Sequence, residues 1–179
     1  MIIGALLMKS SHVKKLVLTA LLAALTMIAT LFIRIPLPLG YVNLGDAFVL
    51  LSALLLGPLY GTIAAGLGSA LADLFGYITY APGTLIIKSL MAIVAYCLYA
   101  VVTQNGSKRL ILGEILGGAV AAVLMAWGYF LYEILLFETA AVAIVNVPFN
   151  LLQGAVGVLL CILVMRLLIA TKTLERLRS

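Results

Sequence analysis

Long apolar runs, separated by short clusters of charged or turn-forming residues, make up most of this sequence. A helix needs about 20 consecutive apolar residues to cross a hydrocarbon core that is about 30 Å thick. Several runs reach that length, and one is shorter. The pattern therefore predicts an all-α integral membrane protein, a bundle of six helices at Leu16–Ile33, Asp46–Leu56, Leu59–Ile78, Pro82–Val102, Leu110–Tyr132 and Pro148–Ala170.

The short run at Asp46–Leu56 decides how many times the chain crosses the membrane. As a helix it spans only about 16 Å, and Gly57-Pro58 ends it because proline disfavours helix in the residue before it. If this run crosses, nine of the eleven Lys and Arg residues share one side, as the positive-inside rule expects; otherwise the nine divide three against six. We therefore predict six crossings with both termini in the cytoplasm. The nine residues are Lys9, Lys14, Lys15, Lys108, Arg109, Arg166, Lys172, Arg176 and Arg178.

The same pattern divides the chain into three parts. We expect a cytoplasmic N-terminal segment at 1–15, the six-helix transmembrane domain at 16–170 and a basic cytoplasmic tail at 171–179. The longer connections, 34–45 and 133–147, then lie outside, where loops often carry specificity. The apolar stretch Met1–Leu7 is too short for the core of a signal peptide, and Met8 resembles a more natural start.

Composition supports a membrane location, because 65% of the residues are apolar, 9% are charged and the mean hydropathy is +1.29. A soluble domain carries about a quarter charged residues. The net charge of +5 comes from basic residues beside apolar runs, which indicates topology and not nucleic-acid binding. The sequence has no phosphate-binding loop, metal-ligand spacing or Ser/His pair, so we expect no catalytic residue, no metal and no cofactor. Cys97 and Cys161 lie in apolar runs and are expected to pack without a disulfide.

Small residues recur every four positions in two of the predicted helices, Leu59–Ile78 and Leu110–Tyr132. This spacing lets helix backbones approach closely in lipid. The first helix carries the same spacing at Ala20 and Ala24. Two interpretations of that pair stay open: packing inside the bundle, or a docking surface for another membrane protein.

Two ionisable residues lie inside predicted helices near the outer side, Asp73 and Lys88. A charge at depth costs about 2.5–3.5 kcal/mol on insertion scales, so each needs a partner or a purpose. In a helical hairpin that turns near Tyr80 they lie at the same level, and we expect them to pair, either as a structural lock or in a cavity open to the outside. Asp46 is expected to cap its helix, and Glu114 to be solvated at the inner side.

Three amides share one face of the last helix, because Asn146, Asn150 and Gln153 follow i, i+4, i+7 spacing. Asn146 is expected to cap that helix. Asn150 and Gln153 must find partners in hydrocarbon, and we expect them to contact a ligand. On the preceding helix, Tyr129 and Glu133 share a face, and an aromatic ring beside a carboxylate suits a flat polar ligand.

Four stretches resemble the substrate-binding S components of energy-coupling factor (ECF) vitamin importers, in particular the riboflavin-type members. They are Leu18–Leu25 (LTALLAAL), Leu54–Gly61 (LLLGPLYG), Ala65–Leu74 (AGLGSALADL) and Pro148–Gly154 (PFNLLQG). The resemblance covers essentially the whole chain. It implies a bacterial or archaeal cell-membrane protein that captures a water-soluble vitamin from outside. It also implies three partners, a membrane coupling subunit and two cytoplasmic ATPases, with no enzymatic activity in this chain.

The resemblance further implies where partner and ligand bind. Docking to the coupling subunit maps onto Ala20 and Ala24, and the ligand pocket maps onto the outer half of the bundle. Both charge signs, amides and aromatic rings occur there, which suits a flat heteroaromatic vitamin such as riboflavin, a pyridoxine-like ring or a thiamine precursor. The candidate ligand-binding residues are Arg34, Tyr41, Asn43, Lys88, Trp127, Tyr129, Glu133, Asn150 and Gln153.

Two other functions remain open on the residues alone. The chain could be a membrane scaffold or assembly protein whose polar groups are all structural, or an autonomous small transporter that acts as a homodimer. A coupling subunit that copurifies would favour the S component, and transport by the purified chain alone would favour the autonomous carrier.

Overall fold

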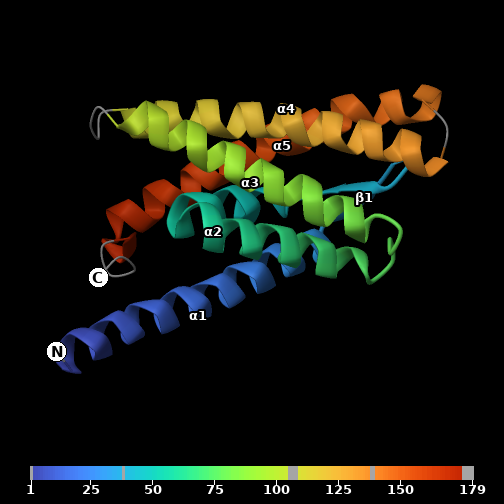
Figure 1. Ribbon diagram of the computed structural model, residues 1–179. Coiled ribbons are helices and arrows are strands. Elements are labelled where there is room, and N and C mark those ends of the chain that lie inside the picture. Colours follow the sequence, from blue (N-terminus) through green and yellow to red (C-terminus); the bar gives the residue numbers. More distant parts are fainter. Residues whose placement is uncertain (1, 38, 105–108, 138–139, 175–179) are drawn as a thin grey trace.

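The computed structural model describes residues 2–37, 39–104, 109–137 and 140–174, with side chains from residue 12 onward (Figure 1). Within these ranges the chain forms five helices and one small antiparallel sheet. The elements are α1 (Ile2–Phe32), β1 (Arg34–Pro36), β2 (Tyr41–Asn43), α2 (Asp46–Asp73), α3 (Ala81–Thr103), α4 (Leu110–Phe137) and α5 (Ala140–Ala170). Lys108, between α3 and α4, lies outside the described residues, as do residues 175–179 of the expected basic tail.

Helix α2 consists of two limbs joined at a sharp bend. Gly57 has φ 79° and ψ −173°, outside the helical region, and Pro58 follows it. Glycine tolerates positive φ, and proline lacks the N–H that would continue the helix. The second limb folds back on the first, so that a Cβ on Gly61 would lie 2.7 Å from Cα of Ala53. The break predicted at Gly57-Pro58 is therefore confirmed.

All five described helices are long and apolar enough to cross a membrane, which confirms the predicted all-α membrane architecture. The first limb of α2, Asp46–Leu56, rises only about 16 Å, so the number of six crossings stays a prediction. The start of α1 and the end of α5 lie at the same end of the bundle (Figure 1), as six passes require. Which end faces the cytoplasm also stays a prediction.

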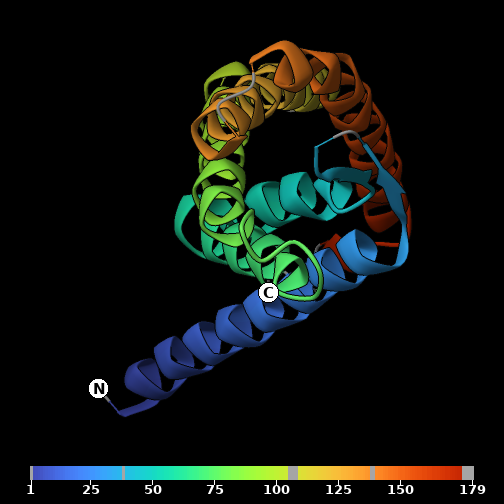
Figure 2. The same cartoon turned by 90° about the vertical axis from the view of Figure 1, so that its right-hand side faces the viewer.

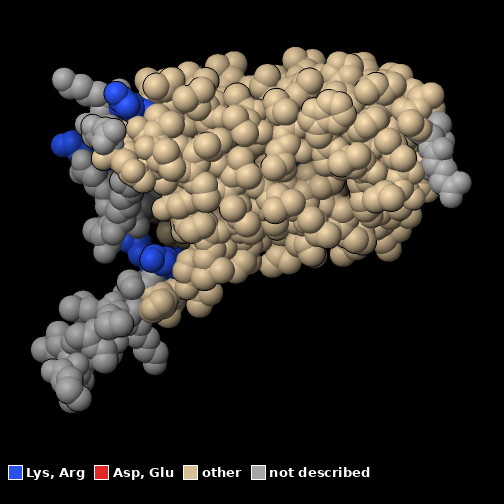
Figure 3. Space-filling view, turned by 45° about the horizontal axis from the view of Figure 1, so that its top comes forward, with Lys and Arg blue, Asp and Glu red and all other residues tan. Residues whose placement is uncertain are grey.

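Charge is distributed unevenly over the described residues. The face in Figure 3 carries Lys and Arg side chains at one end and is otherwise uncharged where side chains are described. Lys15, Arg109 and Lys172 are exposed. All four acidic residues that the structure describes are buried: Asp46, Asp73, Glu114 and Glu133. The three exposed basic residues therefore lie at one end of the bundle, and the described acidic residues lie inside it.

The connection expected at 133–147 is almost entirely helical, which corrects the sequence-based boundaries. Helix α4 continues to Phe137, and α5 begins at Ala140 and includes Pro148. The apolar residues before Pro148 continue the helical pattern, and membrane helices tolerate an internal proline where neighbouring groups satisfy the freed backbone. The expected start of the last helix at Pro148 was therefore wrong.

A β-hairpin joins α1 to α2, where the sequence predicted only a loop. Arg34 pairs with Asn43, Ile35 with Val42 and Pro36 with Tyr41. Seen from the end of the molecule that carries the hairpin (Figure 2), helices α2 to α5 and the hairpin form a ring, and α1 lies along the outside of α2. The hairpin therefore brings Tyr41 and Asn43 to the end of the ring.

Helix packing relies on small residues, as predicted. The glycine at position 68 lies directly against the backbone of Ala23 in α1, and a Cβ on Gly117 would lie 2.6 Å from the carbonyl oxygen of Ala95 in α3. By contrast, Ala20 and Ala24 are exposed on the outer face of α1. Of the two interpretations of that pair, packing inside this bundle is therefore wrong.

Glu114 is not solvated, contrary to expectation. Its side chain is 1% exposed and forms an ion pair with Arg166 on α5, whose side chain is 34% exposed. The two helices pack closely at this level, so the carboxylate lies between them and not in the aqueous phase. Cys161 and Leu54 line a small cavity beside it, and the described cysteines, Cys97 and Cys161, are both free.

Candidate ligand-binding site

A polar cavity lies beneath the hairpin, enclosed by all five helices. Its volume is about 20 Å³, which is room for about one water molecule. A larger ligand therefore requires lining side chains to move apart. The lining residues are Thr30, Leu37, Leu39, Tyr41, Asn43, Ser69, Asp73, Tyr80, Thr84, Lys88, Tyr129, Glu133, Asn150 and Gln153.

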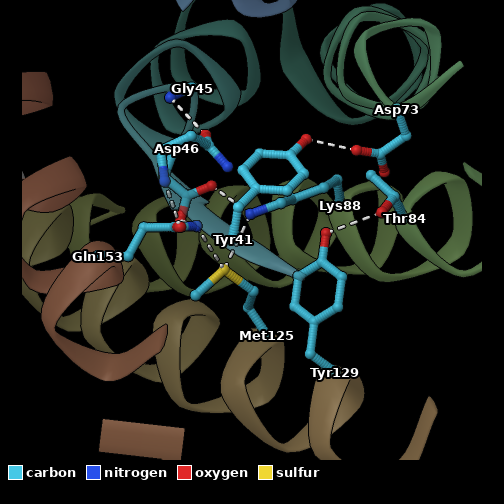
Figure 4. Close-up of polar contacts among 10 residues, drawn as sticks. Tyr41, Gly45, Asp46, Asp73, Thr84, Lys88, Met125, Tyr129 and Gln153 are labelled. Atoms are coloured by element: carbon cyan, nitrogen blue, oxygen red, sulfur yellow. Dashed lines mark hydrogen bonds and ion pairs between the residues drawn. The ribbon is translucent and has the colours of Figure 1, made fainter. Parts of the chain in front are cut away.

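The centre of the polar network is an ion pair between Lys88 on α3 and Asp46 at the start of α2 (Figure 4). Gln153 donates from Nε2 to the second carboxylate oxygen of Asp46 at 2.8 Å, and its Oε1 accepts the backbone N–H of Asn43 at 2.7 Å. Nζ of Lys88 also lies 2.9 Å from Sδ of Met125. Both charges are thus buried, and side chains from two other helices, Gln153 on α5 and Met125 on α4, contact them directly.

The expected pairing of Lys88 with Asp73 is wrong, as is the expected role of Asp46 as a helix cap. Gly45 occupies the cap position, and no side chain caps α2 there. The carboxylate of Asp46 instead turns into the bundle, because the short first limb of α2 starts at the depth of Lys88. Asp73 accepts a hydrogen bond from the hydroxyl of Tyr41 on the hairpin (Figure 4).

Tyrosines close the cavity toward the hairpin. Burial, followed by the negative charge of Asp73, raises the pKa of Tyr41 well above its ordinary value. Burial, followed by the charge of Glu133, raises the pKa of Tyr80 in the same way. Both hydroxyls therefore keep their protons and serve as donors. Tyr129 on α4 shares a hydrogen bond of 3.0 Å with Thr84 on α3.

A second carboxylate, Glu133 on α4, lies at the other side of the lining and is 2% exposed. Nδ2 of Asn146 lies 3.1 and 3.2 Å from its two oxygens, and the hydroxyl of Tyr80 lies 3.4 Å from Oε1. The same Asn146 amide donates to the carbonyl of Leu39 at 2.6 Å. Asn146 is therefore not a helix cap, because it lies inside α5 and links Glu133 to the hairpin.

Two buried hydroxyls in the lining have no hydrogen-bond partner among the described residues. Thr30 on α1 is 2% exposed and Ser69 on α2 is 1% exposed. Buried hydroxyls are normally satisfied by protein or by a bound molecule. These two are therefore available to a ligand in the cavity.

Seven of the nine candidate residues line this cavity: Tyr41, Asn43, Lys88, Tyr129, Glu133, Asn150 and Gln153. The other two do not. Arg34 lies behind Tyr41, with its guanidinium 4.7 Å from the centre of that ring and a 2.7 Å hydrogen bond to the carbonyl of Ala72. Trp127 is 50% exposed and packs edge-on against Phe130, facing away from the bundle. Ligand contact by the seven stays a prediction.

Two lining residues that were not among the candidates, Ser69 and Thr84, have a readable signal in the sequence. Thr84 precedes Lys88 by four positions, and Ser69 precedes Asp73 by four. Residues four apart share a helix face, so each hydroxyl could have been inferred from the charged residue one turn away. Thr30 and Tyr80 carry no comparable signal, because their positions depend on how α1 and the α2–α3 turn pack.

A larger cavity, of about 600 Å³, lies at the opposite half of the bundle between α1, the first limb of α2, α3 and α5. Its lining is almost wholly apolar, with Leu21, Leu51 and Tyr99 among its members and Lys15 as its described charge. In a membrane such a groove faces lipid or another protein. It offers no polar constellation that could hold a vitamin.

Comparison with known proteins agrees with this architecture. A family model for the S component of ECF-type riboflavin transporters matches residues 10–170. A Pyrococcus woesei protein, described as an uncharacterized protein in the gap 3′ region, is 42% identical over 104 residues, which is 57% of this chain and 66% of that protein. The match thus spans about two thirds of that relative's length. The solved structure of the S component of a bacterial ECF transporter superposes with a TM-score of 0.68, at 22% identity, over 89% of this chain and 98% of its own.

Proposed function

This chain belongs to the family of S components of ECF-type riboflavin transporters, and we propose that it captures a water-soluble heteroaromatic vitamin from outside the cell. Members of this family are the substrate-binding membrane subunits of their transporters and are not enzymes. The chain is accordingly a multi-pass membrane protein that binds a transported substrate. The identity of the vitamin, the direction of capture and the partner subunits belong to the proposal.

The observation that carries this proposal is the hydroxyl pair of Thr30 and Ser69 in the cavity beneath the hairpin. Both are buried and lack partners among the described residues. A purely structural network would satisfy such groups or replace them with apolar ones, because a buried unsatisfied hydroxyl is unfavourable. A scaffold protein gains nothing from them. A binding protein uses them when its ligand is in place.

The cavity combines the features of a vitamin site. Three tyrosines supply flat faces, and an ion pair, two further carboxylates and the amides of Asn150 and Gln153 supply donors and acceptors. Small-molecule sites typically pair apolar walls with a few well-placed polar groups. The ring of a flat vitamin would lie against the tyrosines and its polar edge against the amides. Riboflavin, a pyridoxine-like ring or a thiamine precursor would satisfy this arrangement.

Delivery into the cell would require partners, and the outer face of α1 suits one of them. Ala20 and Ala24 are exposed there, with Val17, Leu21 and Ile28 alongside. Small side chains at four-residue spacing permit close approach of another membrane helix. We assign this face to the coupling subunit, which would link the chain to two cytoplasmic ATPases. The termini would then face the cytoplasm of a bacterial or archaeal cell.

Native mass spectrometry of the freshly purified chain in mild detergent tests the capture function. We expect a retained small molecule of vitamin size on the wild-type protein and on Leu152→Ala, whose side chain is 62% exposed on the lipid-facing side of α5. The adjacent Gln153→Ala variant should lose it. A chain that retains nothing, and that no vitamin stabilises against heat, would contradict the proposal.

A further inference from the structure

Carboxylates outnumber cations in the lining of the cavity beneath the hairpin. Asp73 and Glu133 are 1% and 2% exposed, and Lys88 is the basic residue of the described lining. The charge of Lys88 is already matched by Asp46. The next cation, Arg34, lies outside the lining, behind the ring of Tyr41, although its charge and that of Lys88 both act on Asp73. The lining therefore has a surplus of negative charge.

Glu133 shows this surplus most clearly, because its described partners are all neutral. It accepts hydrogen bonds from Asn146 at 3.1 and 3.2 Å and from Tyr80 at 3.4 Å. A buried carboxylate without a cation is costly unless a proton or a counter-charge neutralises it. A ligand that carries a positive charge would supply that counter-charge.

Aromatic rings in the same lining are suited to a cation. Tyr41, Tyr80 and Tyr129 all contribute to it. The face of an aromatic ring attracts positive charge, and several rings together form the common recognition site for organic cations. Tyr129 already lies 5.4 Å from Nζ of Lys88, measured to the ring centre, so this ring accommodates positive charge in the present arrangement.

The unpartnered hydroxyls give an independent indication that a ligand completes this site. Thr30 and Ser69 line the cavity, and their hydroxyls neither donate to nor accept from the described residues. The two hydroxyls can each donate or accept, whereas the two ionised carboxylates only accept. The carboxylates therefore favour a ligand with N–H or O–H donors, and the hydroxyls can bind either a donor or an acceptor of that ligand.

We propose that this cavity selects an organic cation, a ring compound whose positively charged nitrogen is neutralised by Glu133 or Asp73 and faces the tyrosine rings. The inference rests on the proposed capture function and narrows its substrate class from heteroaromatic vitamins in general to those that carry positive charge. Neutral flavin-like compounds and carboxylate-bearing vitamins are thereby disfavoured.

Charge-matched probes test this selectivity on the wild-type full chain in detergent, by thermal stabilisation and calorimetric titration. Pyridoxamine and pyridoxine differ in an aminomethyl against a hydroxymethyl group, and thiamine carries a fixed positive charge. Riboflavin represents neutral ligands and biotin anionic ones. We expect one of the cations to bind, and pyridoxamine to stabilise the protein more than pyridoxine if a pyridine ring fits.

Two isosteric variants locate the charge that matters. Glu133→Gln and Asp73→Asn keep side-chain shape and remove one negative charge each. Loss of the ion pair with a buried ligand cation should weaken binding of the bound cation at least about tenfold in one of them. Glu114→Gln is the matched control, since it makes the same change on α4 at the small cavity that Cys161 and Leu54 line, and it should leave affinity unchanged.

The outcomes separate the two claims. Binding of a cation that is weakened by Glu133→Gln or Asp73→Asn supports both the capture function and the charge selectivity. Binding of riboflavin or biotin alone, or cation binding that both variants leave unchanged, overturns the selectivity while the capture function stands. Cation binding that both variants leave unchanged would mean that a proton neutralises the surplus carboxylate. No binding by any probe, with no retained small molecule, overturns the capture function and the selectivity with it.

Discussion

The two halves of the bundle each contain an ion pair between neighbouring helices, but the pairs lie in different surroundings. Lys88 and Asp46, near the hairpin, are bordered by Gln153, tyrosines and unpartnered hydroxyls. Glu114 and Arg166, at the opposite half, border a small cavity lined by apolar residues such as Leu50 and Val158. An ion pair therefore does not by itself mark a site. What marks the site is the polar lining around the pair.

Breaking the pair near the hairpin should have the largest effect on stability. Lys88→Met leaves Asp46 buried and charged, and removing one partner of a buried pair costs about 3–5 kcal/mol. The double variant Lys88→Met with Asp46→Asn should recover most of that stability but not ligand binding. Thermal unfolding in detergent, together with ligand titration, measures both. A double variant that binds as well as wild type would show that this pair is purely structural.

The pair at the opposite half should cost less to break, because Arg166 is partly exposed and solvent can replace it. Arg166→Met should lower the free energy of unfolding by about 1–3 kcal/mol, through the unpaired Glu114 carboxylate. Adding Glu114→Gln should restore stability. Ligand affinity should stay at the wild-type value throughout. If the double variant recovers stability but binds the ligand more weakly, the pair at the opposite half also contributes to binding, which contradicts the proposed difference between the two halves.

Two small residues test separately the packing of α1 inside the bundle and its docking to a partner. Ala20→Leu adds bulk on an exposed face, whereas Gly68→Ala forces a Cβ against the backbone of Ala23. We expect Gly68→Ala to destabilise the isolated chain by about 1–3 kcal/mol, as overpacking does. Ala20→Leu should leave the isolated chain and its ligand affinity unchanged but abolish association with a coupling subunit. Copurification of the complex and thermal unfolding of the chain alone give the two readouts, and full assembly by Ala20→Leu would place the docking surface elsewhere.

The smallest effect on stability is expected at the unpartnered hydroxyl of Ser69. Ser69→Ala removes a buried hydroxyl that has no partner among the described residues, so stability should be unchanged or slightly higher. Ligand affinity should nevertheless fall about tenfold, the equivalent of about 1.4 kcal/mol. Ser52→Ala is a suitable control, because that buried hydroxyl bonds its own helix at the carbonyl of Phe48. Equal affinities for wild type and Ser69→Ala would exclude this hydroxyl from the site.

The candidates predicted from the sequence include half of the lining residues, partly because ionisable and amide residues in apolar helices are conspicuous. Asn150 and Gln153 were placed by helical spacing alone, and both line the cavity. The partner of Lys88 could not be found in this way. Asp46 meets Lys88 because the start of α2 packs against α3 at that level, which helical spacing within one helix does not reveal.

The choice between neighbouring aromatic residues was also beyond the sequence. Trp127 and Tyr129 are two positions apart, about 200° around a helix, so both cannot face the same cavity. Only Tyr129 does. The extent of α5 was missed for a related reason: Pro148 reads as a helix start, yet the structure places it inside the helix.

The central claim, that a captured vitamin lies beneath the hairpin, is tested most directly by comparing two adjacent residues of α5. Asn150 lines the cavity, whereas Phe149 is 43% exposed on the lipid-facing side. For the ligand identified on the purified chain, calorimetric titration of Asn150→Ala should give an affinity about tenfold to a hundredfold weaker than wild type, the expected cost of one lost hydrogen bond to a buried ligand. Phe149→Ala should bind as wild type does. An unchanged affinity in Asn150→Ala, or an equal loss in both variants, would contradict the placement of the binding site.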